Sequence, residues 1–177
     1  GRYFPDPGKA LMNVSGICAS AFVIAVLLLT PIAKFTQFRV ISRYRRFVGL
    51  GAFLYSILHL IVYLVLFAGL SVSWIISDLV EKPYIYAGVL AVIILSALAV
   101  TSTKKMMRRL GKNWKVVHRL VYLVAVCIVA HLWLQVKSDI TVAMWVSVFI
   151  VPLLVIRINQ SSYYKKYFKK TFKKGLR

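Results

Sequence analysis

Three histidines are the residues of this chain best placed to do chemistry, because all three lie in or at the edge of apolar segments. They are His59, His118 and His131. An ionisable side chain inside a membrane is costly and is usually functional, although a single one more often makes an interhelical hydrogen bond. Three together, with almost no other polar residue at that depth, favour a cofactor site.

The spacing of these residues predicts two levels in the membrane. His118 and His131 are 13 residues apart, which is about 20 Å along a helix, and His59 follows Arg45 by about 21 Å. If the two helices are parallel, Arg45 and His118 share an inner level, and His59 and His131 share an outer level. Two facing imidazoles are the axial ligands that a six-coordinate b-type haem needs.

One feature of this spacing fits a straight helix poorly. A step of 13 residues is about 3.6 turns, so His118 and His131 would point in different directions without tilt or bending. A set of histidines that relays protons in a transporter is therefore an alternative to a haem site.

The segments that carry the histidines are long enough to cross a membrane. The chain is 60% hydrophobic and 16% charged, which departs from the composition of soluble proteins. A transmembrane helix needs about 20 apolar residues. Five segments contain no Lys, Arg, Asp or Glu: Ala10–Ala33, Phe47–Ser77, Pro83–Thr103, Leu120–Val136 and Ile140–Ile156. We therefore predict an all-α integral membrane bundle of five transmembrane helices.

The second segment is too long for one span. We expect its end, Gly69–Trp74, to leave the membrane as an interfacial segment, with Trp74 at the level of the lipid headgroups.

Positive charge gathers on one side of the predicted bundle. Of 24 Lys and Arg residues, five lie between the first two helices, seven between the third and fourth, and eight after the fifth. Loops rich in Lys and Arg stay in the cytoplasm, so we expect a periplasmic N-terminus and a cytoplasmic C-terminus in a bacterial inner membrane. This distribution explains the formal charge of +20 without nucleic acid.

We divide the chain into a membrane domain, residues 1–158, and a basic cytoplasmic tail, residues 159–177. The tail alternates aromatic and basic residues and is expected to lie on anionic lipid.

Other kinds of site have little support in the sequence. Cys18 and Cys127 stand alone inside predicted helices, without the spacing of a metal or disulfide motif. The run Gly49-Leu-Gly51 has no preceding strand, so it indicates close helix packing and not a phosphate loop. With no soluble domain long enough to build a core, the electron donor must be a separate chain or a small diffusible molecule.

Several runs of residues resemble one known family, the MsrQ (YedZ) family of the ferric reductase-like transmembrane group. The resemblance covers nearly the whole chain and is strongest from Leu29 to Lys137. The runs that carry it are Leu29–Pro31, Arg43–Leu50, Leu58–Tyr63, Lys82–Tyr84, Thr101–Tyr122 and His131–Trp133.

The resemblance implies an inner-membrane b-type cytochrome, an electron-transfer subunit of an oxidoreductase system. It implies a cytosolic flavin or NAD(P)H reductase as donor, and as acceptor a periplasmic MsrP-like molybdopterin enzyme that repairs methionine sulfoxide in oxidised proteins. The histidines of the family fall on His59, His118 and His131, and Arg45 stands where the wider group has an inner histidine. Family members usually carry six helices, and we expect the first to be absent from this chain.

We expect His59 and His131 to be the axial ligands of an outer haem b, with Tyr63 lining the site. His118 would be the only protein histidine on an inner haem. Arg45 has no lone pair for iron and would hold a haem propionate with charge-assisted bonds. The alternative at this level is the phosphate of a flavin mononucleotide (FMN).

The acceptor stays open, because no acceptor site is legible in the short outer loops. Direct reduction of ferric iron or of another acceptor, a proton-coupled carrier and an anchor subunit are the other functions to be tested.

The predicted topology can be tested by cysteine accessibility. A cysteine placed at Lys105 should be shielded from a membrane-impermeant reagent added on the periplasmic side, and one placed at Lys137 should react with it, since basic loops stay inside. Periplasmic labelling at Lys105 would reverse the donor and acceptor sides.

Overall fold

The computed structural model describes residues 6–36, 41–136 and 139–174, and within them the chain is helical with no strand. This confirms the all-α prediction. The elements are α1 (Pro7–Thr36), α2 (Ile41–Val62) with a π-helix (Tyr63–Phe67), α3 (Val72–Glu81), α4 (Tyr84–Thr101), α5 (Lys104–Leu110), α6 (Asn113–Val117), a 3₁₀-helix (His118–Leu120), α7 (Val121–Gln135) and α8 (Thr141–Lys174).

Five helical stretches in the described residues are long and apolar enough to cross a membrane, as the charge-free segments predicted. They are Pro7–Ala33, Tyr44–Phe67, Tyr84–Thr101, Asn113–Gln135 and Thr141–Asn159. Large apolar side chains such as Leu54, Ile93 and Val148 are more than half exposed, which is the surface that lipid would cover. Helix α8 passes the expected boundary at residue 158 without a break. Lys137 and the side chains of the basic tail lie outside the described residues.

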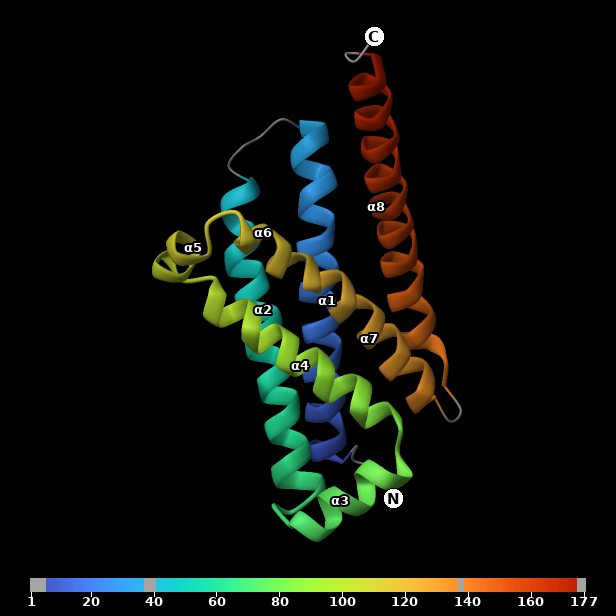
Figure 1. Cartoon of the computed structure of the whole chain (residues 1–177). Coiled ribbons are helices and arrows are strands. Elements are labelled where there is room, and N and C mark those ends of the chain that lie inside the picture. Colours follow the sequence, from blue (N-terminus) through green and yellow to red (C-terminus); the bar gives the residue numbers. More distant parts are fainter. Residues whose placement is uncertain (1–5, 37–40, 137–138, 175–177) are drawn as a thin grey trace.

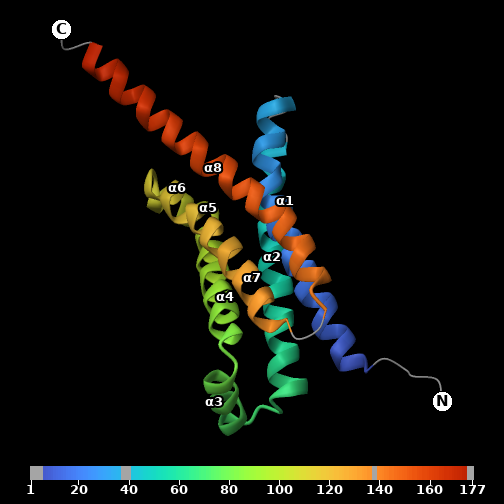
Figure 2. The same ribbon diagram turned by 90° about the vertical axis from the view of Figure 1, so that its right-hand side faces the viewer.

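The helices form two antiparallel pairs. Helix α1 packs mainly against α2, and α4 packs mainly against α7. Figure 2 shows the two pairs next to each other, with α8 lying across α1 and α7 and extending beyond them. Buried apolar side chains from both pairs and from α8, including Val23, Leu95, Val124 and Ile150, form the core between them.

The bundle has two different ends, which Figure 1 shows at the bottom and the top. The N-terminal end of α1 and helix α3 lie at one end, and the tail of α8 extends from the other. The lower end is the one assigned to the periplasm by charge, and the upper end is the one assigned to the cytoplasm.

The first transmembrane hairpin ends in irregular backbone. The last turn of the second span is a π-helix, and Gly69 and Leu70 follow with φ of 56° each. Left-handed backbone at two successive residues cannot continue an α-helix, so α3 starts as a separate element at Val72. The candidate span ends at Phe67, which is consistent with the expected departure of the chain near Gly69, and the interfacial position of Trp74 stays a prediction.

The fourth span is also interrupted. His118–Leu120 form a 3₁₀-helix between α6 and α7. A 3₁₀-helix turns about 120° per residue and an α-helix about 100°. Three such steps reduce the angle between the directions of His118 and His131 from about 140° to about 80°. The misfit seen in the sequence is thus partly removed by a local change of helix type.

Candidate functional site

The two outer histidines lie close together between the helix pairs. His59 comes from α2 and His131 from α7, and their ring centroids are 6.3 Å apart with an angle of 80° between the ring planes. The prediction that these two residues share one level is consistent with this proximity. The two helices that carry them belong to different pairs, so the site lies where the pairs meet.

Each outer imidazole is held by a backbone carbonyl of the neighbouring helix. His59 Nδ1 lies 3.0 Å from the carbonyl oxygen of Met12 on α1, and His131 Nδ1 lies 2.8 Å from that of Tyr84 on α4. A carbonyl only accepts, so each Nδ1 carries the proton and donates it. The lone pair of each ring is then on Nε2, the arrangement typical of histidines that bind a metal.

Polar and aromatic neighbours complete this level. The hydroxyl of the buried Ser15 donates to the same Met12 carbonyl at 3.0 Å and lies 3.3 Å from His59 Nδ1. The ring of Tyr84 meets His131 edge-on, with the centroids 5.5 Å apart. The two imidazoles are therefore fixed by contacts from α1 and from α4.

The separation of the rings fits two ligands of one metal ion. A metal–imidazole bond is about 2.0–2.1 Å, taking the value for zinc. In a five-membered ring with bonds of roughly 1.35 Å, each nitrogen lies about 1.15 Å from the centroid. Two imidazoles on opposite sides of one ion would then have centroids about 6.3–6.5 Å apart, and the observed distance is 6.3 Å.

The outer level offers two imidazole ligands. No group of three or more His, Cys, Asp or Glu side chains in the described residues could hold an ion. Two histidines suffice for haem iron because the porphyrin supplies the other four nitrogens. The outer level therefore fits a haem with two histidine ligands.

The inner level contains His118 in a different setting. The indole of Trp114 stacks on its ring, with centroids 4.0 Å apart and 29° between the planes. The Ser102 hydroxyl lies 3.3 Å from His118 Nε2. Within the described part of the chain, His118 Nδ1 is buried without a hydrogen bond of good geometry, although the Trp114 backbone interacts with the ring. A buried polar atom without a partner is rare and calls for an explanation, and a bound group at this level would supply one.

Arg45 is among the charged groups that act on His118, and their common level stays a prediction. No second histidine is available here, since the sequence contains only the three already placed. Arg45 is exposed as a residue, while its charged group is partly buried near Tyr122 and Arg157. The inner level thus offers one imidazole and one fixed positive charge.

Sequence reasoning missed several residues of these two levels. Met12 and Tyr84 contribute backbone carbonyls, which every residue type possesses, so no sequence signal marks them. Ser102 and Trp114 contribute side chains. Trp114 lies four residues before His118, a spacing that places two side chains on one face of a helix, and it could have been identified from that spacing.

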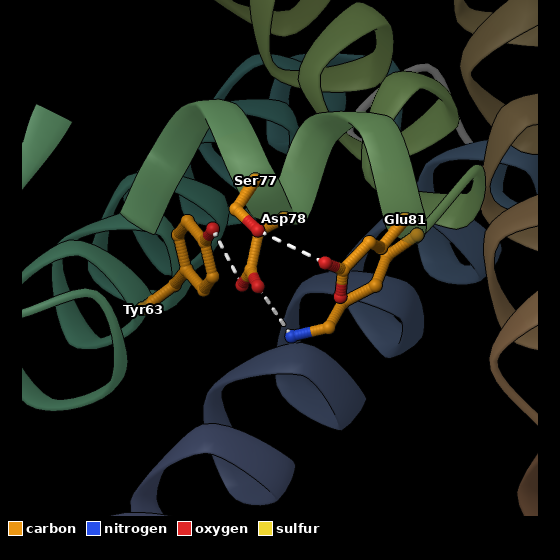
Figure 3. Close-up of polar contacts among 5 residues, drawn as sticks. Tyr63, Ser77, Asp78 and Glu81 are labelled. Atoms are coloured by element: carbon orange, nitrogen blue, oxygen red, sulfur yellow. Dashed lines mark hydrogen bonds and ion pairs between the residues drawn. The ribbon is translucent and has the colours of Figure 1, made fainter. Parts of the chain in front are cut away.

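Tyr63 has its hydroxyl in a cluster at the outer end, shown in Figure 3. It donates to Asp78 Oδ2 at 3.0 Å, and the Lys82 ammonium donates to Asp78 Oδ1 at 2.6 Å. The bond from Lys82 holds the pKa of Asp78 below its ordinary value. These contacts join the π-helical end of the second span to α3. The expectation that Tyr63 lines the haem site stays a prediction.

Comparison with known proteins places these residues in a family context. The model of the family described as ferric reductase like transmembrane component matches residues 15–129. The chain is 39% identical over 138 residues to proteins from Brucella ovis and Brucella canis named protein-methionine-sulfoxide reductase heme-binding subunit MsrQ, and 38% identical to the protein of that name from Brucella melitensis. These alignments cover 78% of this chain and 62% of each relative. No solved structure gives a significant match.

The role of Tyr63 can be tested by substitution. Tyr63→Phe removes the bond to Asp78 and should lower the stability of the protein in detergent by about 1.5 kcal/mol, the lower end for bonds to charged groups. Cofactor content should be unchanged, because the ring remains. Thermal unfolding and visible spectra would measure both, with the exposed Tyr86→Phe as control. A loss of cofactor would instead place the Tyr63 hydroxyl in the binding site.

Proposed function

The chain belongs to the ferric reductase-like transmembrane component family, and on that premise we propose that it is a haem-binding electron-transfer subunit of a bacterial inner membrane. The observation that carries this proposal is the pair His59 and His131. Their ring separation matches two axial ligands, and both Nδ1 atoms are already engaged.

In this proposal His59 and His131 would hold haem b through their Nε2 atoms. When bound, the haem supplies reversible one-electron chemistry, which no side chain of the pair can provide. The carbonyls of Met12 and Tyr84 keep the Nδ1 protons in place, which fixes the tautomer and the direction of each ring. The apolar helices exclude water and lower the local dielectric, one of the means by which a protein tunes a redox potential.

The inner level would provide the second step across the membrane. His118 would bind a second haem as its only protein histidine, and Arg45 would hold a propionate with charge-assisted bonds. The positive charge of Arg45 and the single imidazole also fit the alternative, the phosphate and ring of FMN. Substitution of His118 and of Arg45 distinguishes a haem from FMN at this level.

The partners we propose follow the charge distribution and the named relatives. Electrons would enter from a cytosolic flavin reductase, on the side that carries most of the Lys and Arg residues. They would leave to a periplasmic molybdopterin methionine sulfoxide reductase of the MsrP kind. The relatives' name associates them with protein-methionine-sulfoxide reductase, and the chain spans 62% of their length, so both partners belong to the proposal.

Replacement of the outer ligands tests the central claim. Purified protein should be red and show the reduced-minus-oxidised spectrum of a low-spin b-type haem. His59→Ala and His131→Ala should each abolish the six-coordinate signal of the outer haem, because each removes one axial ligand. A colourless wild-type protein would favour the proton-coupled carrier. An unchanged spectrum and full haem content in His131→Ala would refute the pairing.

The inner level is tested by haem quantification. His118→Ala should lose one haem and leave the outer low-spin signal intact, whereas Arg45→Lys should keep most of the inner cofactor, because lysine retains the positive charge. Extraction of FMN from wild type but not from Arg45→Ala would favour the flavin alternative. Equal haem content in wild type and His118→Ala would show that His118 carries no haem of its own.

A further inference from the structure

The two outer histidines are held in matching ways, although they come from different helix pairs. In each case the imidazole donates to the carbonyl of a residue on the partner helix, Met12 on α1 or Tyr84 on α4. In each case the residue four positions later on that helix is a glycine, Gly16 or Gly88. Since the carbonyl of residue i accepts the N–H of residue i+4 in an α-helix, carbonyl and glycine belong to the same helical turn.

The glycines leave the space that the imidazole rings occupy. A Cβ atom added at Gly16 would lie 3.0 Å from His59 Cε1 and 3.1 Å from Nδ1. One added at Gly88 would lie 2.9 Å from His131 Nδ1 and 3.1 Å from Cε1. The same ring edge, Nδ1–Cε1, therefore meets the glycine in both places. No other residue type permits this approach without displacing the ring.

Displacement of this edge would also displace Nε2, which is bonded directly to Cε1. An imidazole is rigid and planar, so a shift at Nδ1 and Cε1 tilts or moves Nε2, the atom proposed to bind iron. The Nδ1 bonds, at 3.0 and 2.8 Å, leave little room for such a shift. A methyl group at either glycine would therefore either break the Nδ1 hydrogen bond or move Nε2 from its position.

We propose that Gly16 and Gly88 are positioning residues for the axial ligands, each forming with the carbonyl of Met12 or Tyr84 a socket that sets the direction of the His59 or His131 ring. This inference rests on the proposed haem function. It predicts that the near-perpendicular arrangement of the rings, 80° between their planes, is set by α1 and α4.

Two other glycines provide matched controls on α2. A Cβ at Gly49 would meet its nearest neighbour, Val26, at an ordinary distance of 3.9 Å. A Cβ at Gly51 would meet the Phe22 ring at 2.7 Å, so Gly51→Ala disturbs the packing of α1 on α2 as severely as the socket variants do but touches no histidine. Gly49→Ala controls for the added helix propensity of alanine, and Gly51→Ala controls for general packing strain.

The experiment compares Gly16→Ala and Gly88→Ala with both controls in haem-loaded protein. Visible and electron paramagnetic resonance spectra report the spin state and the relative angle of the ligand planes, and a redox titration reports the midpoint potential. Both socket variants should lose low-spin signal or change its anisotropy, and added imidazole should restore a low-spin spectrum. Haem retention should fall about tenfold or more, as for other residues that orient metal ligands.

The two control variants distinguish an effect on the histidine ligands from a general effect on helix packing. Gly49→Ala should match wild type, and Gly51→Ala should lower thermal stability without changing spectrum or potential. Wild-type spectra and potentials in both socket variants would overturn the inference, and so would the same spectral change in Gly51→Ala. A haem-free wild type would instead refute the proposed function on which it rests.

If a glycine variant does not accumulate, a double variant that also lacks the neighbouring histidine shows the cause. If Gly88→Ala fails to fold because of its contact with the imidazole, Gly88→Ala combined with His131→Ala should accumulate as well as His131→Ala alone. The same comparison applies to Gly16→Ala with His59→Ala. Failure in both backgrounds would show that the glycine acts on helix packing and not on the ligand, and would overturn the proposal.

Discussion

The outer site depends on one constraint: an imidazole N–H inside a membrane must find its acceptor within the protein. Water is absent there, and an unpaired polar group costs several kcal/mol. His59 and His131 meet this requirement with carbonyls of Met12 and Tyr84, which also lie within helical hydrogen-bond ladders. A carbonyl oxygen has two lone pairs, so the helix and the histidine can share it. This sharing requires each histidine helix to pack closely on one partner, and the pairs α1–α2 and α4–α7 follow from it.

The same constraint applies to the imidazole of His118 at the inner level, but the contacts of this ring are different. Ser102 lies against His118 Nε2 and Trp114 stacks on the ring, but Nδ1 makes no hydrogen bond of good geometry with the residues that the structure describes. At the outer level the protein satisfies both Nδ1 atoms and leaves two Nε2 atoms for a ligand. At the inner level one imidazole stands opposite no second histidine, with Arg45 within electrostatic range. The two levels therefore differ in ligand supply, and groups of different chemistry or coordination at the two levels are consistent with this difference.

The sequence was sufficient to predict the spans and the proximity of His59 and His131, because both depend on simple physical quantities. Charge-free length predicts a membrane helix, and rise per residue places His59 and His131 at one depth. The π-helix after Val62 and the 3₁₀-helix at His118 could not be predicted, because their formation depends on packing against other elements and not on residue type. The hydrogen-bond partners of the histidines could not be predicted for a different reason. A backbone carbonyl is common to all residues, so Met12 and Tyr84 carried no signal.

The glycines show how such a socket could be recognised in a sequence. The two segments that hold the histidines, Met12–Gly16 and Tyr84–Gly88, share only their final glycine. That pattern follows from the geometry, since any residue can supply a carbonyl but only glycine lacks a Cβ. Glycines in membrane helices are usually explained by the close approach of two helices. Gly51 fits that explanation, because its neighbour is the Phe22 ring of α1. Gly16 and Gly88 face the imidazoles of His59 and His131 instead, and in our proposal the direction of those rings explains why glycine stands at both positions.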